Sequence, residues 1–173
     1  MNAGELTLPI RDAAASQPNF AALMAAHQQR VLRTAYRLLG RMEDAQDASQ
    51  EVFLRLLKNL DKMDGDPQAW LYRVTVNVCN DQFRRRLEVV DSQERTDPAP
   101  SAQRVLKLDE RKQLLMAGLS KLPERERAAV VLRDIEGLPT REVAAILGVE
   151  EVTVRTQISA ARMKLAKYVR NAK

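Results

Sequence analysis

The sequence predicts an all-α protein built from two small helical domains that are joined by a flexible linker. Its 173 residues include only six glycines and seven prolines and few aromatic side chains, a composition that favours helices. Apolar residues recur at three- and four-residue steps in two regions, and a polar, proline-bearing stretch separates them. We therefore expect an N-terminal arm (1–19), a first domain (20–86), a linker (87–104) and a second domain (105–173).

Two helices open the first domain. The first begins at Phe20 and is followed by Gly40, which suits the left-handed position after a helix. The second runs from Glu43 to Asn59, and its acidic start complements the positive end of the helix dipole. Its apolar side is formed by Val52, Phe53, Leu56, Leu57 and Leu60.

The third segment of this domain is ambiguous between strand and helix. Residues 61–66 indicate a loop, and Pro67 suits the first turn of a helix. Val74, Val76 and Val78 alternate as in a half-buried strand, yet the segment also fits a helical stripe and continues without a turn signal to Arg86. Because its neighbours are helical, we predict a helix, in which Trp70 is a core residue rather than a stacking platform.

The second domain is expected to contain a helix-turn-helix. A helix over 105–119 and another from Pro123 to Ile135 precede it, and Gly137 should end the latter. A short helix from Thr140 then meets a turn at Gly148 and a second helix. The predicted contact between these two helices consists of Val143, Ala144, Leu147, Val154 and Ile158.

The charge of the last helix favours nucleic-acid binding. No acidic residue follows Glu151, whereas six Lys or Arg residues do, at spacings that can track a phosphate backbone. Cations that merely complement the dipole of a solvated helix are the alternative. Because the turn and the charge coincide, we favour a helix that lies in the major groove of DNA.

The composition argues against metal sites and catalytic clusters. A single cysteine, Cys79, excludes an intrachain disulfide, and with one histidine, His27, no zinc cluster is plausible. Asp44, Asp47 and Glu51 could in principle hold Mg²⁺, but they also suit a helix start. We expect no cofactor, no metal and no enzymatic activity, and, because neither a signal peptide nor a long apolar run is present, a cytoplasmic protein.

Four stretches resemble one known family, the extracytoplasmic-function (ECF) sigma factors of bacterial RNA polymerase. They are DAQDASQEVFLRL from Asp44 to Leu56, WLYRVTVN from Trp70 to Asn77, NDQFRRR from Asn80 to Arg86, and LSKLPERER from Leu119 to Arg127, which precedes the helix-turn-helix. The resemblance implies sigma region two in the first domain and sigma region four in the second. It also implies core RNA polymerase, promoter DNA and an anti-sigma factor as partners.

The resemblance assigns residues to three interfaces. Contact with the clamp helices of the largest polymerase subunit is implied for Asp44, Asp47, Gln50, Glu51, Phe53 and Leu54. Recognition and opening of the −10 element is implied for Lys62, Met63, Arg73, Asn77, Asn80, Asp81, Arg84 and Arg85. Region four would bind the flap of the second-largest subunit and read the −35 element with Thr140, Arg141, Thr153, Arg155, Thr156, Ser159, Arg162 and Lys164.

Two other classes of protein remain open from the residues alone. A repressor that uses the same helix-turn-helix independently of polymerase would bind an operator by itself. A helical adaptor that binds regulators would show only weak, salt-insensitive binding to nucleic acid. The basic C-terminal helix argues against the adaptor.

Overall fold

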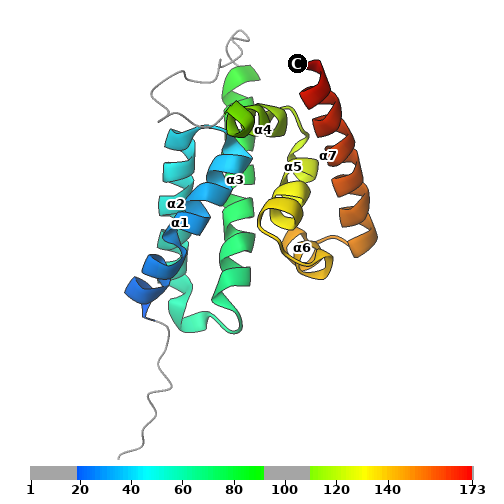
Figure 1. The fold of residues 1–173 in the computed structure, drawn as a ribbon. Helices are drawn as coiled ribbons and strands as arrows, with labels where there is room; N and C mark the ends of the chain where they lie inside the picture. Colours follow the sequence, from blue (N-terminus) through cyan, green and yellow to red (C-terminus); the bar gives the residue numbers. More distant parts are fainter. Residues whose placement is uncertain (1–18, 92–109, 173) are drawn as a thin grey trace, which may run out of the picture.

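The computed structural model describes residues 19–91 and 110–172, and it is helical without any strand in these two ranges. The predicted all-α class is therefore confirmed. Figure 1 shows two groups of helices side by side, with α1 to α3 in one group and α4 to α7 in the other.

The first group is a three-helix bundle. It consists of α1 (Phe20–Leu39), α2 (Met42–Asn59), a short 3-10 turn η1 (Leu60–Lys62) and α3 (Pro67–Asp91). Asn19 caps α1, because its Oδ1 accepts a hydrogen bond of 3.0 Å from the backbone N–H of Ala21. Gly40, with φ of 78°, ends that helix as predicted. The bundle core is apolar and includes Val31, Ala35, Val52, Phe53, Leu56, Leu71 and Val78.

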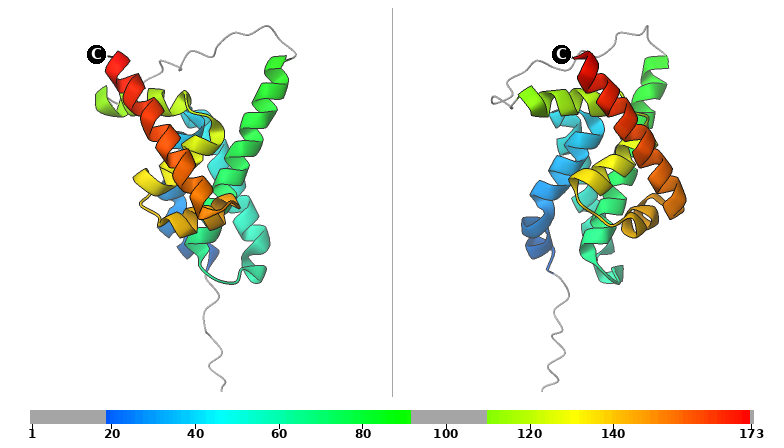
Figure 2. Two further views of the ribbon diagram at one scale, coloured as in Figure 1. Left: turned by 90° about the vertical axis from the view of Figure 1, so that its right-hand side faces the viewer. Right: turned by 45° about the vertical axis from the view of Figure 1, so that its right-hand side comes forward.

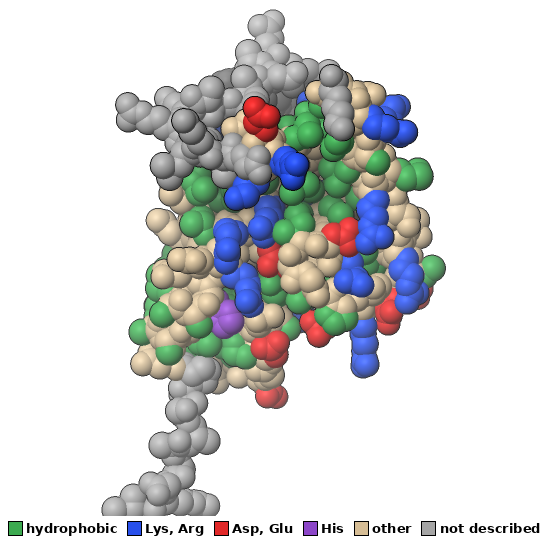
Figure 3. Space-filling view, in the orientation of Figure 1, with side chains coloured by type: hydrophobic (Ala, Val, Ile, Leu, Met, Phe, Trp, Pro, Cys, Tyr) green, Lys and Arg blue, Asp and Glu red, His purple; other side chains and the backbone are tan. Residues whose placement is uncertain are grey.

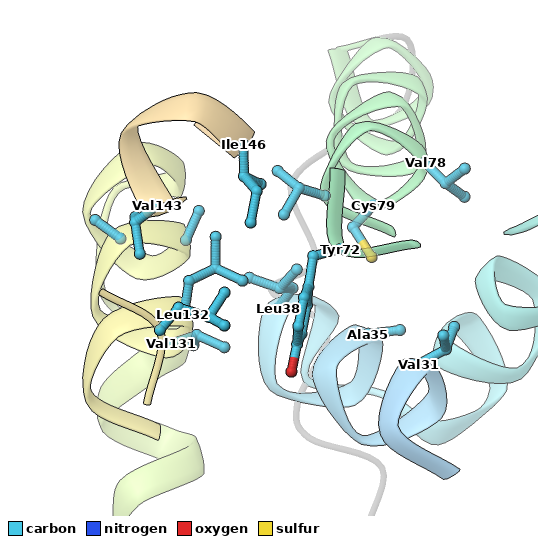
Figure 4. Packing of buried hydrophobic residues seen from close by; sticks show 14 of the residues in the cluster. Val31, Ala35, Leu38, Tyr72, Val78, Cys79, Val131, Leu132, Val143 and Ile146 are labelled. Atoms are coloured by element: carbon cyan, nitrogen blue, oxygen red, sulfur yellow. The ribbon is translucent and has the colours of Figure 1, made fainter. Parts of the chain in front are cut away.

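The second group contains the predicted helix-turn-helix. It consists of α4 (Glu110–Ser120), α5 (Glu124–Val130), a π-helical turn η2 (Val131–Ile135), α6 (Thr140–Leu147) and α7 (Glu151–Asn171). Gly148 adopts φ of 66° between α6 and α7, so the turn requires its freedom. Val143, Ala144, Val154 and Ile158 are buried as predicted, whereas Leu147 is only half-buried. The neighbouring Ile146 is buried instead, on the side of α6 that faces the first domain (Figure 4).

Some predicted boundaries were wrong. The helix α3 continues to Asp91, so 87–91 are helical rather than linker, because no glycine or proline interrupts the segment after Arg86. The 3-10 turn occupies the start of the predicted loop over 61–66. The helix predicted over 105–119 is described from Glu110 onward, and its residues 105–109 are not tested. They lie outside the described residues, together with 1–18 of the predicted arm and 92–104 of the predicted linker.

The two groups of helices pack against each other, and α3 lies between them. Contacts join α3 to α6 and α1 to α4, and the views in Figure 2 show α3 alongside the second group. Val76 and Val78 are both 2% exposed, although they point to different sides of α3. Because both the first bundle and the second domain cover α3, apolar residues are buried on two of its sides. Apolar residues two positions apart can therefore both be buried in a helix, which explains why the sequence alternates as a strand would. Trp70 is half-buried and packs against the core, as predicted.

Candidate polymerase and nucleic-acid interfaces

An apolar groove runs between α1 and α2. It has a volume of about 570 Å³, and Phe20, Met24, Gln28, Gln29, Leu32, Ser49, Gln50, Phe53, Leu54 and Leu57 line it. Leu54 and Leu57 are 51% and 54% exposed, although both belong to an otherwise well-packed helix. An exposed apolar surface with a polar rim is typical of a protein interaction site.

The structure brings three of the six predicted polymerase contacts, Gln50, Phe53 and Leu54, into this groove. The acidic residues lie elsewhere on α2. Asp44 forms an ion pair with Arg86 of α3 and approaches Arg41 at 3.9 Å, while Asp47 is exposed. Glu51 accepts a 2.8 Å hydrogen bond from Arg55, and this contact lowers the pKa of its carboxyl. Asp44 therefore joins α2 to α3, whereas the pair of Glu51 and Arg55 lies within α2.

Four of the eight predicted −10 residues share one face of α3. Arg73, Asn77, Asn80 and Arg84 follow one another at three- and four-residue steps, and all but the half-buried Asn80 are exposed. This face therefore carries two guanidinium groups and two amides, which are groups able to contact phosphates and base edges.

The remaining −10 residues lie around that face. Asp81 is beside Arg55, with their side chains 4.0 Å apart, and Arg85 is exposed. Lys62 and Met63 come before α3, and Met63 is half-buried against the core.

The predicted −35 residues lie along α6 and α7. Arg155, Thr156, Ser159, Arg162 and Lys164 are exposed on α7. At the start of α6, Arg141 is exposed and Thr140 half-buried, and Thr153 is half-buried near the start of α7. The arrangement fits a helix-turn-helix whose second helix presents polar side chains to a groove.

The basic charge that the sequence places along α7 is partly neutralised by carboxylates of neighbouring elements. Arg162 forms two hydrogen bonds with Asp134, at 2.7 and 2.8 Å, and these bonds lower the pKa of that carboxyl. Lys164 contacts both carboxylate oxygens of Glu126 at 2.8 Å. Figure 3 shows Lys and Arg side chains interleaved with Asp and Glu over this domain. The carboxylates come from α5 and η2, so reading along α7 could not reveal them.

Sequence reasoning missed two buried or nearly buried ionisable side chains of the second domain, Arg127 and Glu136. Arg127 is 6% exposed, and the side chain of Glu136 is 9% exposed. Both make hydrogen bonds to the first domain. Periodicity does not reveal these contacts, because Glu136 reaches Thr34 across 102 residues of chain and Arg127 reaches Leu38 across 89.

The described ranges hold neither a candidate metal centre nor a candidate membrane span. No group of three or more His, Cys, Asp or Glu residues within 19–91 and 110–172 could hold a metal ion. Across the same ranges, every helix is too short or too polar to cross a bilayer. Cys79 is 2% exposed and His27 half-buried. Burial lowers the pKa of His27, and the charge of Arg30 adds to this effect.

Comparisons with known proteins match both domains. The family model for sigma-70 region 2 matches residues 23–88, and the model for sigma-70 region 4 matches 112–165. The chain is 38% identical to the ECF RNA polymerase sigma factor SigE of Mycolicibacterium smegmatis, over 90% of this chain and 63% of that protein. It is 32% identical to the ECF RNA polymerase sigma factor SigM of Mycobacterium tuberculosis, over 87% of this chain and 76% of that protein.

Two solved structures are similar over most of their length. The sigma factor RpoE of Bartonella quintana, in complex with the anti-sigma factor NepR, superposes with a TM-score of 0.72 at 22% identity and covers 87% of this chain and 96% of its own. CnrH in complex with the cytosolic domain of CnrY has a TM-score of 0.66 at 26% identity and covers 89% of each chain.

Proposed function

Because the chain belongs to the extracytoplasmic-function sigma factors of RNA polymerase, we propose that it binds core polymerase and directs promoter-specific initiation through −10 and −35 elements. The observation that carries this proposal is the exposed apolar groove between α1 and α2, in a chain that also has a helix-turn-helix. A repressor that acts alone does not need such a groove. In this proposal the chain acts in the cytoplasm without catalytic activity, and polymerase supplies the chemistry.

The groove supplies the surface for docking on the clamp helices of the largest subunit. Leu54 and Leu57 project apolar side chains from α2, and Gln50 provides a polar edge. A helical partner that lies in this groove buries apolar area at its centre and hydrogen-bonds at its rim. In the second domain, Leu115 of α4 is 40% exposed and offers an apolar contact for the flap of the second-largest subunit.

The exposed face of α3 is suited to the −10 element. Opening DNA needs cations to hold a displaced strand and polar groups to receive unstacked bases. Arg73 and Arg84 can hold phosphates, and Asn77, between them on the same face, can hydrogen-bond a base edge. The proposed −10 site also includes Lys62 and Met63, which lie at the end of the 3-10 turn that precedes α3.

Arg155→Ala is expected to weaken binding to a −35 element by about 1–3 kcal/mol, because the exposed Arg155 side chain is a candidate for a base-edge contact. The measurement is fluorescence anisotropy with duplexes that carry either the cognate element or a scrambled one. The predicted loss is confined to the cognate duplex. An equal loss on both duplexes would make Arg155 a phosphate contact, and unchanged binding would remove it from the site.

Asp134→Asn is expected to strengthen DNA binding by about 2- to 5-fold, because it releases Arg162 from a carboxylate that competes with phosphate. The measurement is the affinity for a −35 duplex at several salt concentrations. Glu43→Gln, which removes an exposed carboxylate from the first domain, is the control for the change of net charge. An equal gain in both variants would show a general charge effect and exclude a local role of Asp134.

Transcription with purified components tests the proposed function. The full chain is mixed with active core polymerase and a library of promoter fragments, and transcript starts are mapped. We expect co-elution with core polymerase and specific starts. Specific binding to DNA without any contact with polymerase would instead establish the repressor. Weak, salt-insensitive binding to DNA would establish the adaptor.

We also propose that an anti-sigma factor regulates the chain by covering the α1–α2 groove. The solved complex of CnrH with the cytosolic domain of CnrY supports a protein partner for a similar chain. Because the groove is exposed and mainly apolar, a regulator bound there would exclude polymerase by direct competition.

A further inference from the structure

One carboxylate of the second domain is held by three donors of the first. Glu136 Oε1 accepts hydrogen bonds from Thr34 Oγ1 at 3.0 Å and from Arg37 Nη1 at 2.5 Å. Its Oε2 accepts one from Tyr72 Oη at 3.0 Å. Burial and the adjacent carboxylate raise the pKa of Tyr72, so its hydroxyl remains a donor at physiological pH. Both oxygens of Glu136 are therefore satisfied by side chains from α1 and α3.

A buried guanidinium makes a second polar connection between the domains. Arg127 Nη1 donates to the carbonyl oxygen of Leu38 at 2.6 Å, in the last turn of α1. A cation at this end of a helix stabilises carbonyls that have no partner within the helix. The guanidinium also lies 5.5 Å from the ring centroid of Phe83 in α3, close enough for a cation–π interaction. Arg127 thus touches two helices of the first domain.

Apolar side chains fill the space between these polar contacts. Figure 4 shows Leu38 and Tyr72 of the first domain facing Leu132 and Ile146 of the second. All four side chains are at most 6% exposed. Apolar burial supplies the attraction between the domains, and the directional bonds of Glu136 and Arg127 select one arrangement.

The closed arrangement is too compact to reach both promoter elements. A globule of 173 residues has a diameter of about 40 Å. Positions −10 and −35 are separated by about 25 base pairs, or about 85 Å of B-form DNA. The 18 residues 92–109 can span at most about 60 Å, so the connection between the domains permits a large separation.

We propose that the chain rests in a closed state, latched by Glu136 and Arg127 of the second domain on the first, and that this latch opens before α3 and α7 engage the two promoter elements together. This inference rests on the proposed function. It adds that direct contact between the two domains prevents simultaneous binding of the −10 and −35 elements, before any regulator binds.

The proposed polymerase groove remains accessible in this closed state. All its lining residues belong to α1 and α2, and Figure 1 places α2 on the side away from α5 to α7. Polymerase can therefore dock on the first domain while the latch is still closed. Separation of the second domain follows as a later step.

Cys79 is a built-in reporter of the latch. It is the single cysteine of the chain, and it is 2% exposed. It lines a small pocket together with Leu38, Phe83, Glu124 and Arg127, so both domains cover it. Burial raises the pKa of its thiol to about 12, and only a thiolate reacts with an alkylating reagent. Reaction at pH 7.5 to 8, roughly half a unit or more below the pKa of a free thiol, should therefore depend on opening of the domains.

The experiment measures iodoacetamide alkylation of Cys79 and the radius of gyration from X-ray scattering, on the full chain without polymerase or DNA. Glu136→Gln removes the charge of the latch, and Tyr72→Phe removes only one hydroxyl donor. We expect alkylation to be about tenfold faster for Glu136→Gln, and less so for Tyr72→Phe, with an increased radius of gyration in both. Glu43→Gln removes a carboxylate whose side chain is 76% exposed, away from the interface, and should change neither quantity.

Two outcomes of this experiment would overturn the proposed latch. Unchanged alkylation and unchanged radius in both variants would overturn the latch. Faster alkylation without a larger radius would also overturn it, because the opening would then lie within the first domain. Circular dichroism of each variant reports whether its helices are intact. If these results appear as expected but transcription fails, the closed state stands and the proposed function is wrong.

Discussion

Leu54→Glu is expected to weaken binding to core polymerase by about 100-fold or more. Leu54 is 51% exposed at the groove between α1 and α2, so its substitution removes an apolar contact without disturbing the core of the bundle. Side chains at the centre of an interface commonly contribute about 2–4 kcal/mol to binding, and a glutamate there adds the cost of desolvating a charge. The measurement is the affinity of labelled protein for core polymerase without DNA.

Leu87→Glu is the matched control for this substitution. Leu87 is 56% exposed near the end of α3, outside the groove, and the change of charge is identical. We expect it to bind core polymerase as the unsubstituted protein does. Equal losses in the two variants would reflect net charge and would exclude the groove as the docking site.

Leu56→Ala is expected to lower the free energy of unfolding by about 2–5 kcal/mol. Leu56 is fully buried, with 0% exposure, in the core that α1, α2 and α3 share. Truncation removes buried apolar area and leaves a cavity that the surrounding helices fill only partly. Urea unfolding followed by circular dichroism gives this quantity.

The neighbouring Leu57→Ala serves as the control for stability. Leu57 has the same side chain in the same helix, but it is 54% exposed and lines the groove. We expect its effect on the free energy of unfolding to stay within about 0.5 kcal/mol. Similar losses at both positions would contradict the assignment of one leucine to the core and the other to the groove.

This pair of leucines also shows how far the sequence could predict the candidate site. Periodicity placed Leu56 and Leu57 together on the apolar side of one helix. It could not separate them, because whether an apolar stripe faces the core or a groove depends on where α1 and α3 cover it. The groove itself was therefore not predicted, although Gln50, Phe53 and Leu54 were assigned to a polymerase interface.

The cations of α7 show the same limit. Their positions on an exposed helix follow from the sequence, and Arg155, Arg162 and Lys164 are indeed exposed. The ion pairs of Arg162 with Asp134 and of Lys164 with Glu126 depend on how η2 and α5 pack beside that helix. A count of charges along α7 therefore overstated the number of its cations that lack a carboxylate partner.

The sequence by itself determined the local features of this protein. Apolar steps of three and four, Pro67 at a helix start, and glycines at helix ends specify elements through contacts within a few turns of the chain. The resemblance of four short stretches was enough to indicate the family, because those residues are contiguous.

Only the tertiary structure decided how the two domains meet. Glu136 reaches Thr34 and Arg37 across 102 and 99 residues of chain, and Arg127 reaches Leu38 across 89. No local propensity encodes such contacts, since they arise when two separately formed helical surfaces bury apolar area together and the enclosed polar groups must then find partners.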